Sequence, residues 1–315
     1  MAVRVESRPI PAAGRPRDGF RTVVAVIASV VPVVLAIIVV TLVLQALPAI
    51  RHFGFSFLTT SEWNAVTDHF GALPAIFGTL FTAFMALAIA LPVGVAVAVV
   101  LAEPGHTTIR GYIGIGIELL AAIPSVVYGI WALYVLGPWS YEHIEIPVSE
   151  RLHFIGWFGL PAPRGLFNAS LVLAVMILPT LTAISRDVIK AVPRGLKENA
   201  VALGATWWET TWRVILPSAR AGIFGATVLA LGRALGETIA VTMIIGNQYV
   251  IPHTIFQPAY TLASVIANEF TEATGTIYPA ALVELGLVLI VVTLIVNVLA
   301  LLLVHSASRE ARLTA

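Results

Sequence analysis

The sequence of 315 residues contains no cysteine and few charged side chains. Without cysteine, disulfides and thiolate metal sites are excluded. Asp, Glu, Lys and Arg make up 11% of the residues, against roughly 25% in soluble globular domains, which is too few to cover a water-facing surface. The formal net charge is +1, whereas surfaces that bind nucleic acid are usually strongly basic. A soluble protein and a nucleic-acid partner are therefore both disfavoured.

Three motifs that would indicate an enzyme are also absent from the sequence. There is no G-x-x-x-x-G-K-[ST] loop to cradle nucleotide phosphates, so the chain is not itself an ATPase. H-E-x-x-H and G-x-S-x-G are missing too, which disfavours an enzyme that works within the membrane. No cofactor is expected.

Long apolar runs dominate what is present. Hydrophobic residues make up 58% of the chain, and the mean hydropathy is +0.94. A helix needs about 20 apolar residues to cross roughly 30 Å of hydrocarbon. The stretches that qualify are 22–47, 73–102, 111–137, 167–184, 221–245 and 279–304. The sequence therefore predicts an all-α integral membrane protein with about six transmembrane helices.

The flanks of the spans predict the domain organisation and the orientation. Residues 1–20, rich in Pro, Arg and Gly, are expected to be a disordered tail before a membrane domain at 21–306, with a second tail at 307–315. Of the 18 Lys and Arg residues, fourteen fall on one side, three on the other, and Arg233 lies inside a helix. Because positively charged loops stay inside, both termini are expected in the cytoplasm.

The longest connection on the positive side, residues 185–220, is expected to be helical. Pro193 suits the first turn of a helix, and Gly204 is placed to end it. A second short segment, 206–214, follows, and Leu216-Pro217 is expected to close the loop. Two short helices with a glycine bend would form a compact knob that a soluble partner could push.

The knob carries the first resemblance to a known family. Glu198-Asn199-Ala200, then Gly204, then the run 214–217 resembles the E-A-A, three residues, G, nine residues, I-x-L-P loop of ABC-importer permeases. Asn199 and Val214 depart mildly from that pattern. In the family this loop docks into the ATP-hydrolysing subunit. The resemblance thus implies an ATPase-coupling role for six residues, namely Glu198, Asn199, Ala200, Gly204, Leu216 and Pro217. The alternative is an interfacial amphipathic helix without a partner.

Ionisable residues inside the fifth expected span give the second candidate site. Charged groups within a membrane are costly, and they indicate function by default. Glu237 follows Arg233 by four residues, so the two side chains are expected to share a helix face and to pair. Alternatively, the pair only neutralises itself while Gly232 and Gly236 let two helices pack closely.

The residues around this pair carry the second resemblance. The run 232–247, beginning Gly-Arg-Ala-Leu-Gly-Glu-Thr, and the run 124–129, Pro-Ser-Val-Val-Tyr-Gly, are similar to permeases of the phosphate ABC importer, closer to the C-type than to the A-type. Molybdate and sulfate permeases share the R-A-x-G-E core but typically have an aromatic residue where this chain has Thr238. The resemblance spans about 70–305 and implies a type-1 permease bundle. It also implies a substrate pathway that includes Arg233, Glu237 and Thr238.

The resemblance implies a transport subunit rather than an enzyme. It predicts a permease that moves inorganic phosphate across the bacterial cytoplasmic membrane. The expected partners are a second permease subunit in a heterodimer, two ATP-binding subunits and an external phosphate-binding protein. Two alternatives stay open, an ABC permease for another oxyanion (molybdate or sulfate) and an ion-coupled secondary transporter. The latter would more typically show interrupted helices at corresponding positions of two repeated halves.

Overall fold

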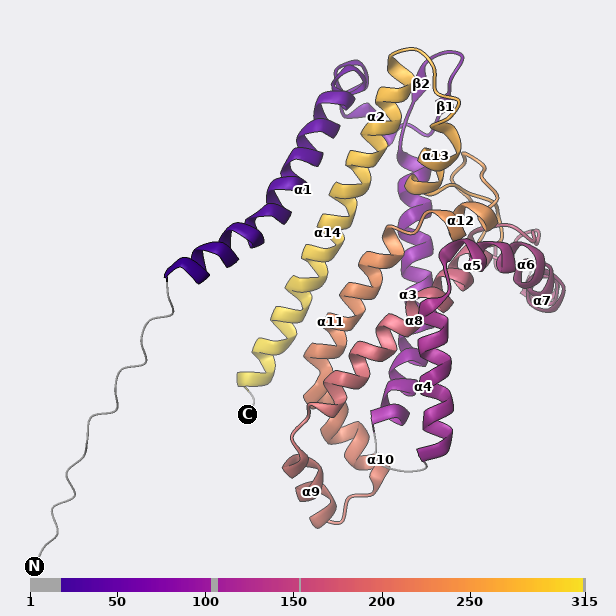
Figure 1. The fold of residues 1–315 in the computed structure, drawn as a ribbon. Helices are drawn as coiled ribbons and strands as arrows, with labels where there is room; N and C mark the ends of the chain where they lie inside the picture. The colour runs from indigo at the N-terminus through magenta and orange to yellow at the C-terminus, as the bar shows by residue number, and fades with distance from the viewer. Residues whose placement is uncertain (1–17, 103–106, 153, 314–315) are drawn as a thin grey trace, which may run out of the picture.

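The computed structural model describes residues 18–102, 107–152 and 154–313, which are mostly helical (Figure 1). The α-helices are α1 (Asp18–Phe53), α2 (Ser56–Thr59), α3 (Leu73–Ala102), α4 (Thr107–Ala122), α5 (Ser125–Trp131), α6 (Gly137–Ser140), α7 (Ile146–Leu152), α8 (Leu166–Lys190), α9 (Arg194–Ala202), α10 (Trp207–Thr210), α11 (Leu216–Leu235), α12 (Ile239–Ile244), α13 (Leu262–Glu269) and α14 (Ile277–Leu313). Three π-helical turns join some of them, η1 (Ala132–Leu136), η2 (Tyr141–Glu145) and η3 (Thr211–Ile215). A two-residue hairpin, β1 (Trp63–Asn64) with β2 (His69–Phe70), is the one sheet in this part of the chain.

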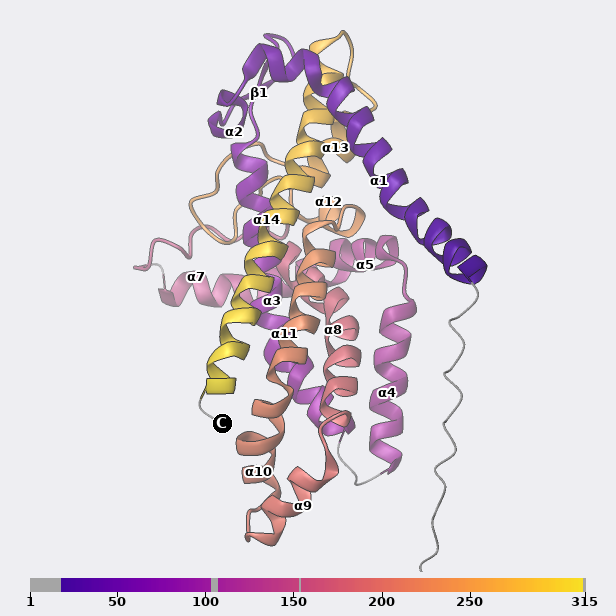
Figure 2. The same ribbon diagram turned by 90° about the vertical axis from the view of Figure 1, so that its left-hand side faces the viewer.

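The described residues contain five helices that are long and apolar enough to cross a membrane, or six if one bent pair counts as a span. The prediction of about six transmembrane helices is therefore confirmed. In Figures 1 and 2 the long helices run side by side from top to bottom, and α9 and α10 protrude at the lower end. Helix α1 leans away from the bundle and packs against α14.

Small residues let the central helices approach closely. Helix α8 is the most buried of the spans, and it packs against α3 and α11. Its α3 contact is built on alanines, of which Ala83, Ala86 and Ala90 are fully buried. A side chain at Gly94 of α3 would come within 2.9 Å of Leu181 on α8. Because lipid tails give no hydrophobic drive for helix association, this close van der Waals packing stabilises the bundle.

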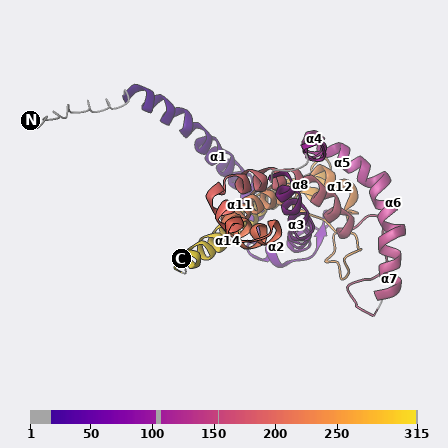
Figure 3. The same cartoon turned by 90° about the horizontal axis from the view of Figure 1, so that it is seen from below.

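The third expected span, 111–137, is wrong as a single straight helix. Helix α4 ends at Ala122, and the helical stretch 125–152 leaves it at an angle of 99°. Pro124 lies at the break, where it lacks an N–H and disfavours helical geometry at the residue before it. Seen from below in Figure 3, α5, α6 and α7 curve along the edge of the bundle, so helix occupies much of the connection beyond 137.

The fifth expected span, 221–245, is also wrong in its bounds. Helix runs from Trp207 through η3 to Leu235, then breaks, and α12 begins at Ile239. Leu216-Pro217 therefore begins α11 instead of closing the loop. The wider π-turn just before Pro217 relieves the clash that its ring would otherwise make with the carbonyl one turn earlier. The connection between α8 and α10 is accordingly shorter than predicted, covering 191–206.

The outer helices extend further than the apolar runs that predicted them. Residues 18–20, expected in the first tail, already belong to α1, while 1–17 lie outside the described residues. Helix α14 continues to Leu313, so most of the expected second tail, 307–315, continues the last helix.

Candidate functional site

The predicted coupling residues lie on the segment that protrudes at the lower end of the bundle. Helix α9 follows Pro193, as expected, and ends in a left-handed turn at Gly204, where φ is +85°. The Ala205 N–H bonds the Ala200 carbonyl (3.0 Å), and the Gly204 N–H bonds the Val201 carbonyl (2.9 Å). These two bonds form a Schellman cap, which needs a residue that tolerates positive φ. The prediction that Gly204 ends the helix is confirmed.

A capping box, which is absent from the sequence predictions above, begins the second short helix. Glu209 accepts a hydrogen bond from the Thr206 N–H (2.9 Å), and the Thr206 hydroxyl accepts one from the Glu209 N–H (3.3 Å). The signal was present in the sequence, since Thr206-x-x-Glu209 is the standard pattern of such a box. The free backbone groups at the end of α9 and at the start of α10 are therefore both hydrogen-bonded. These bonds fix the bend between the two helices on both sides.

The six coupling residues fall into two groups. Glu198, Asn199 and Gly204 are exposed on the protruding segment, whereas Ala200 turns inward and is 8% exposed. Leu216 and Pro217 lie at the start of α11, after η3, and belong to the spanning helix. The structure therefore presents Glu198 of α9 and the bend at Gly204 together at the surface.

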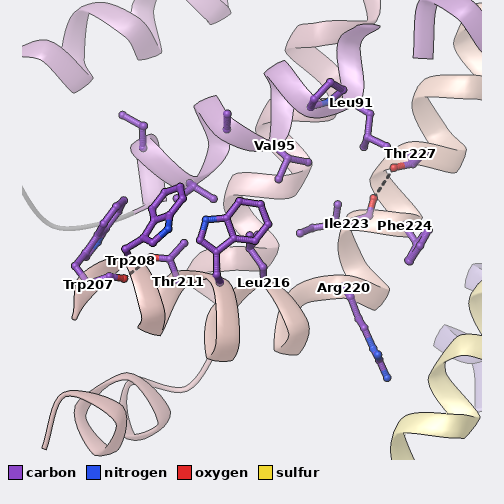
Figure 4. Close-up of a pocket in the computed structure, with 15 residues that line it drawn as sticks. Leu91, Val95, Trp207, Trp208, Thr211, Leu216, Arg220, Ile223, Phe224 and Thr227 are labelled. Carbon is purple, nitrogen blue, oxygen red and sulfur yellow. Dashed lines mark hydrogen bonds between the residues drawn. The ribbon is translucent and has the colours of Figure 1, made fainter. Parts of the chain in front are cut away.

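Three tryptophans join this segment to the bundle. Figure 4 shows Trp207 and Trp208 beside the end of α3. Together with Trp212 they line an apolar groove of about 570 Å³. The three side chains remain between 52% and 60% exposed, so they are available to a membrane interface. Tryptophan rings favour that depth, which would anchor α10 at the membrane surface.

The second candidate group lies at the break between α11 and α12. Arg233 occupies the last turn of α11, is exposed, and donates to the Thr180 hydroxyl of α8 at 3.2 Å. Glu237 lies beyond the helix end, where its carboxylate accepts from the Ala240 N–H of α12 (3.4 Å). Among the described residues no ion pair joins Arg233 to Glu237. The expected pairing on one helix face is therefore wrong, because the helix ends between the two residues.

The break between α11 and α12 restricts what can lie against this face of the subunit. Non-helical backbone at membrane depth is tolerated only where it is covered by protein or lines a water-filled cavity. Gly236 is exposed, and Glu237 and Thr238 are half-buried, so the break is not covered within this subunit. This face must therefore adjoin either another subunit or an aqueous path.

The two runs that resemble phosphate permeases meet at this break. A side chain at Gly129 of α5 would lie 2.5 Å from the Met243 sulfur and 3.1 Å from the Ala240 Cα of α12. The neighbouring Tyr128 hydroxyl donates to the Leu120 carbonyl (2.7 Å), across the bend between α4 and α5. The bend at Pro124 thus lets α5 support the short helix that follows the break.

Comparisons with known proteins agree with this arrangement. The family model of the binding-protein-dependent transport system inner membrane component matches residues 90–309. The phosphate transport system permease protein PstC of Mesorhizobium japonicum is 46% identical, covering 87% of this chain and 85% of that protein. The corresponding protein of Haemophilus influenzae is 44% identical, covering 90% and 92%.

Two solved structures share the fold at low identity. A bacterial alginate ABC transporter aligns with a TM-score of 0.57 and 16% identity, covering 90% of this chain and 94% of that one. The inward-facing MetNI methionine ABC transporter aligns with a TM-score of 0.55 and 17% identity, covering 74% and 94%. The chain therefore belongs to the family of binding-protein-dependent transport system inner membrane components, and within it to the phosphate transport system permeases.

Proposed function

We propose that this chain is one of two permease subunits through which an ATP-driven importer carries inorganic phosphate across the bacterial cytoplasmic membrane. The observation that carries the choice of phosphate is the 46% identity to a phosphate transport system permease over 87% of the chain. As an inner membrane component with several apolar helices, the chain is a multi-pass transport subunit, and ATP hydrolysis belongs to a separate subunit.

The proposed complex has four further components. A second permease subunit would cover the face that carries the helix break, two ATP-binding subunits would dock beneath α9, and an external phosphate-binding protein would deliver the substrate. The exposed break at Gly236 supports the second permease, because lipid cannot satisfy this backbone. The protruding α9 (Figure 1) supports docking of the ATPase, with Glu198 exposed on this helix and Gly204 exposed in the bend that follows it.

Arg233 is the proposed phosphate contact. Arginine stays charged when it leaves water, and its planar donors match phosphate oxygens. Within the described ranges, its side chain donates one hydrogen bond, to the neutral hydroxyl of Thr180, and forms no ion pair with a carboxylate. Such a group can exchange a weak partner for a stronger anionic one.

Glu237 and Thr238 are the proposed selectivity residues. In this structure the Glu237 carboxylate accepts from the Ala240 N–H (3.4 Å), and the Thr238 hydroxyl donates to the Gly236 carbonyl (3.4 Å). Phosphate keeps at least one proton at neutral pH and can donate to a carboxylate. Sulfate keeps none and would meet like charge in a low dielectric, which is costly. Glu237 would thereby favour phosphate and also compete for Arg233 when phosphate leaves.

The test is uptake in a bacterial strain that lacks this chain and is complemented with variants. Wild type should restore uptake of radiolabelled phosphate but not of sulfate or molybdate. Arg233→Gln should abolish phosphate uptake while the complex still co-purifies. Arg233→Lys keeps the charge but loses the planar pair of guanidinium donors, so its phosphate uptake should lie between those of wild type and Arg233→Gln. Glu237→Gln should reduce uptake less and admit sulfate, since an amide can donate. Normal phosphate uptake by Arg233→Gln would remove this residue from the pathway.

The proposed orientation has a test of its own. With both termini in the cytoplasm, a tag within 190–200 should be protected from an impermeant label added outside, and a tag within 142–150 should be reached. The fourteen-to-three distribution of Lys and Arg supports this outcome. Outside labelling of the 190–200 tag would contradict both the orientation and the import direction.

A further inference from the structure

A second cavity opens at the end of the bundle that carries α9. It has a volume of about 1060 Å³ and lies among the adjoining ends of α3, α4, α8 and α9. Among the residues that the structure describes, its lining contains four cationic side chains from three helices, together with the carboxylate of Glu198. The cations are Arg110, Lys190, Arg194 and Lys197.

This concentration of positive charge is unusual for the chain. Four of its 18 Lys and Arg residues line one cavity, although its net charge is only +1. The ion pair that the described residues form at this end joins Arg186 to Asp187 (3.1 Å) outside the cavity. Arg110, Lys190 and Arg194 form none with a described carboxylate. Like charges held together repel, and a bound anion would offset that repulsion.

We propose that this cavity binds a phosphate group carried by an anion on the α9 side of the membrane. Arginine supplies paired donors and lysine a compact charge, which together suit phosphate oxygens. Leu101, Ala102 and Val201 form an apolar wall beside the cations. Both a phospholipid headgroup, whose chains would follow the apolar wall, and free inorganic phosphate present this chemistry.

The position of the cavity gives the ligand a regulatory role. Arg194 and Lys197 are on α9, whereas Arg110 is on α4 and Lys190 ends α8. A phosphate group between them would tie α9 to the spanning helices. This step rests on the proposed function, in which α9 couples transport to the ATPase. Occupancy would then set how far α9 moves when ATP is hydrolysed.

The experiment uses the whole complex in nanodiscs and compares wild type with the double variant Arg110→Gln/Lys190→Gln. One arm measures binding of radiolabelled inorganic phosphate in neutral phosphatidylcholine discs, against an Arg233→Gln background that removes the proposed pathway contact. The other arm counts phosphatidylglycerol retained on the complex by native mass spectrometry. Arg186→Gln is the matched control, because it removes a charge from the same end of α8 outside the cavity. Arg110→Lys/Lys190→Arg keeps both charges.

We expect the double Gln variant to bind one of the two ligands about tenfold more weakly or worse, since two charge-assisted contacts are lost. The Arg186→Gln and charge-keeping variants should bind as wild type does. Loss in the first arm identifies free phosphate as the ligand, and loss in the second identifies the lipid headgroup. Unchanged binding in both arms overturns the proposal. Loss of ATPase co-purification with unchanged binding also overturns it, by assigning the cations to the ATPase. Phosphate uptake by wild type, measured in parallel, tests the proposed function separately.

Discussion

Substituting Gly204 separates the fold of the coupling segment from its contact with the ATPase. The Gly204 backbone has φ +85°, and a side chain built there meets no atom of this subunit within 4 Å. A residue with a side chain pays about 1–2 kcal/mol in this left-handed region, and Asp pays less than most residues. Gly204→Asp therefore adds a small backbone strain and no clash. Since proteins are stable by roughly 5–15 kcal/mol, the subunit should still fold and insert.

Gly204→Asp should weaken the coupling to the ATPase and not the folding of the permease. If Gly204 lies against the ATPase, an unpaired aspartate in that contact would cost about 2–5 kcal/mol, which is at least roughly 30-fold in affinity. The assay is co-purification of the ATPase together with phosphate uptake, with the melting temperature of the permease as the check on folding. Both co-purification and uptake should fall while the melting temperature changes little.

Two further substitutions make the result specific. Gly195→Asp adds the same charge to α9, also where no atom lies within 4 Å, but in the first turn, where an acidic residue is favourable. It should leave coupling near wild type. Gly204→Asn accepts the left-handed turn but still adds a side chain, so it should also uncouple. If Gly204→Asn and Gly204→Asp both transport normally with the ATPase bound, the Gly204 bend does not contact the ATPase.

Two other predictions concern buried contacts of the segment that runs from α5 to α7, each with a matched control. Gly129→Ala should destabilise the subunit by about 1–3 kcal/mol, because the new methyl would press on α12. Gly225→Ala, where no atom lies within 4 Å, should be neutral or slightly stabilising in the same thermal melt; equal melts would contradict the packing argument. Glu145 is fully buried and accepts from the Asn168 amide (2.6 Å) and the Ala162 N–H (2.9 Å). Glu145→Ala should therefore cost about 2–4 kcal/mol, whereas the exposed Glu142→Ala should lie within about 0.5 kcal/mol of wild type.

The sequence predicted the elements that depend on local chemistry. Runs of about 20 apolar residues identify spans because a bilayer imposes that length. Gly204 predicts a helix end, because glycine readily adopts the positive φ found there. The same reasoning could have identified the capping box at Thr206, since its spacing is visible in the sequence.

The sequence did not predict the breaks within apolar stretches. Hydrophobicity is continuous across Pro124, yet the chain turns there by 99°. Prolines inside membrane helices are often tolerated, so the residue alone does not show whether the helix kinks or ends. At Gly236 the helix ends although the run continues, and the Glu237 carboxylate accepts a hydrogen bond from the Ala240 N–H of the next helix. Both outcomes depend on α5 meeting α12, a contact between residues about a hundred positions apart, which local patterns do not contain.

The measurement that tests the account most directly is uptake of radiolabelled phosphate into proteoliposomes that contain the purified complex, with its external binding protein supplied outside. ATP is enclosed inside, and ion gradients are clamped throughout. The account predicts phosphate uptake that requires enclosed ATP, that excess sulfate or molybdate does not compete away, and that Arg233→Gln abolishes with the complex intact. Uptake that persists without ATP, or that favours sulfate or molybdate over phosphate, would contradict it.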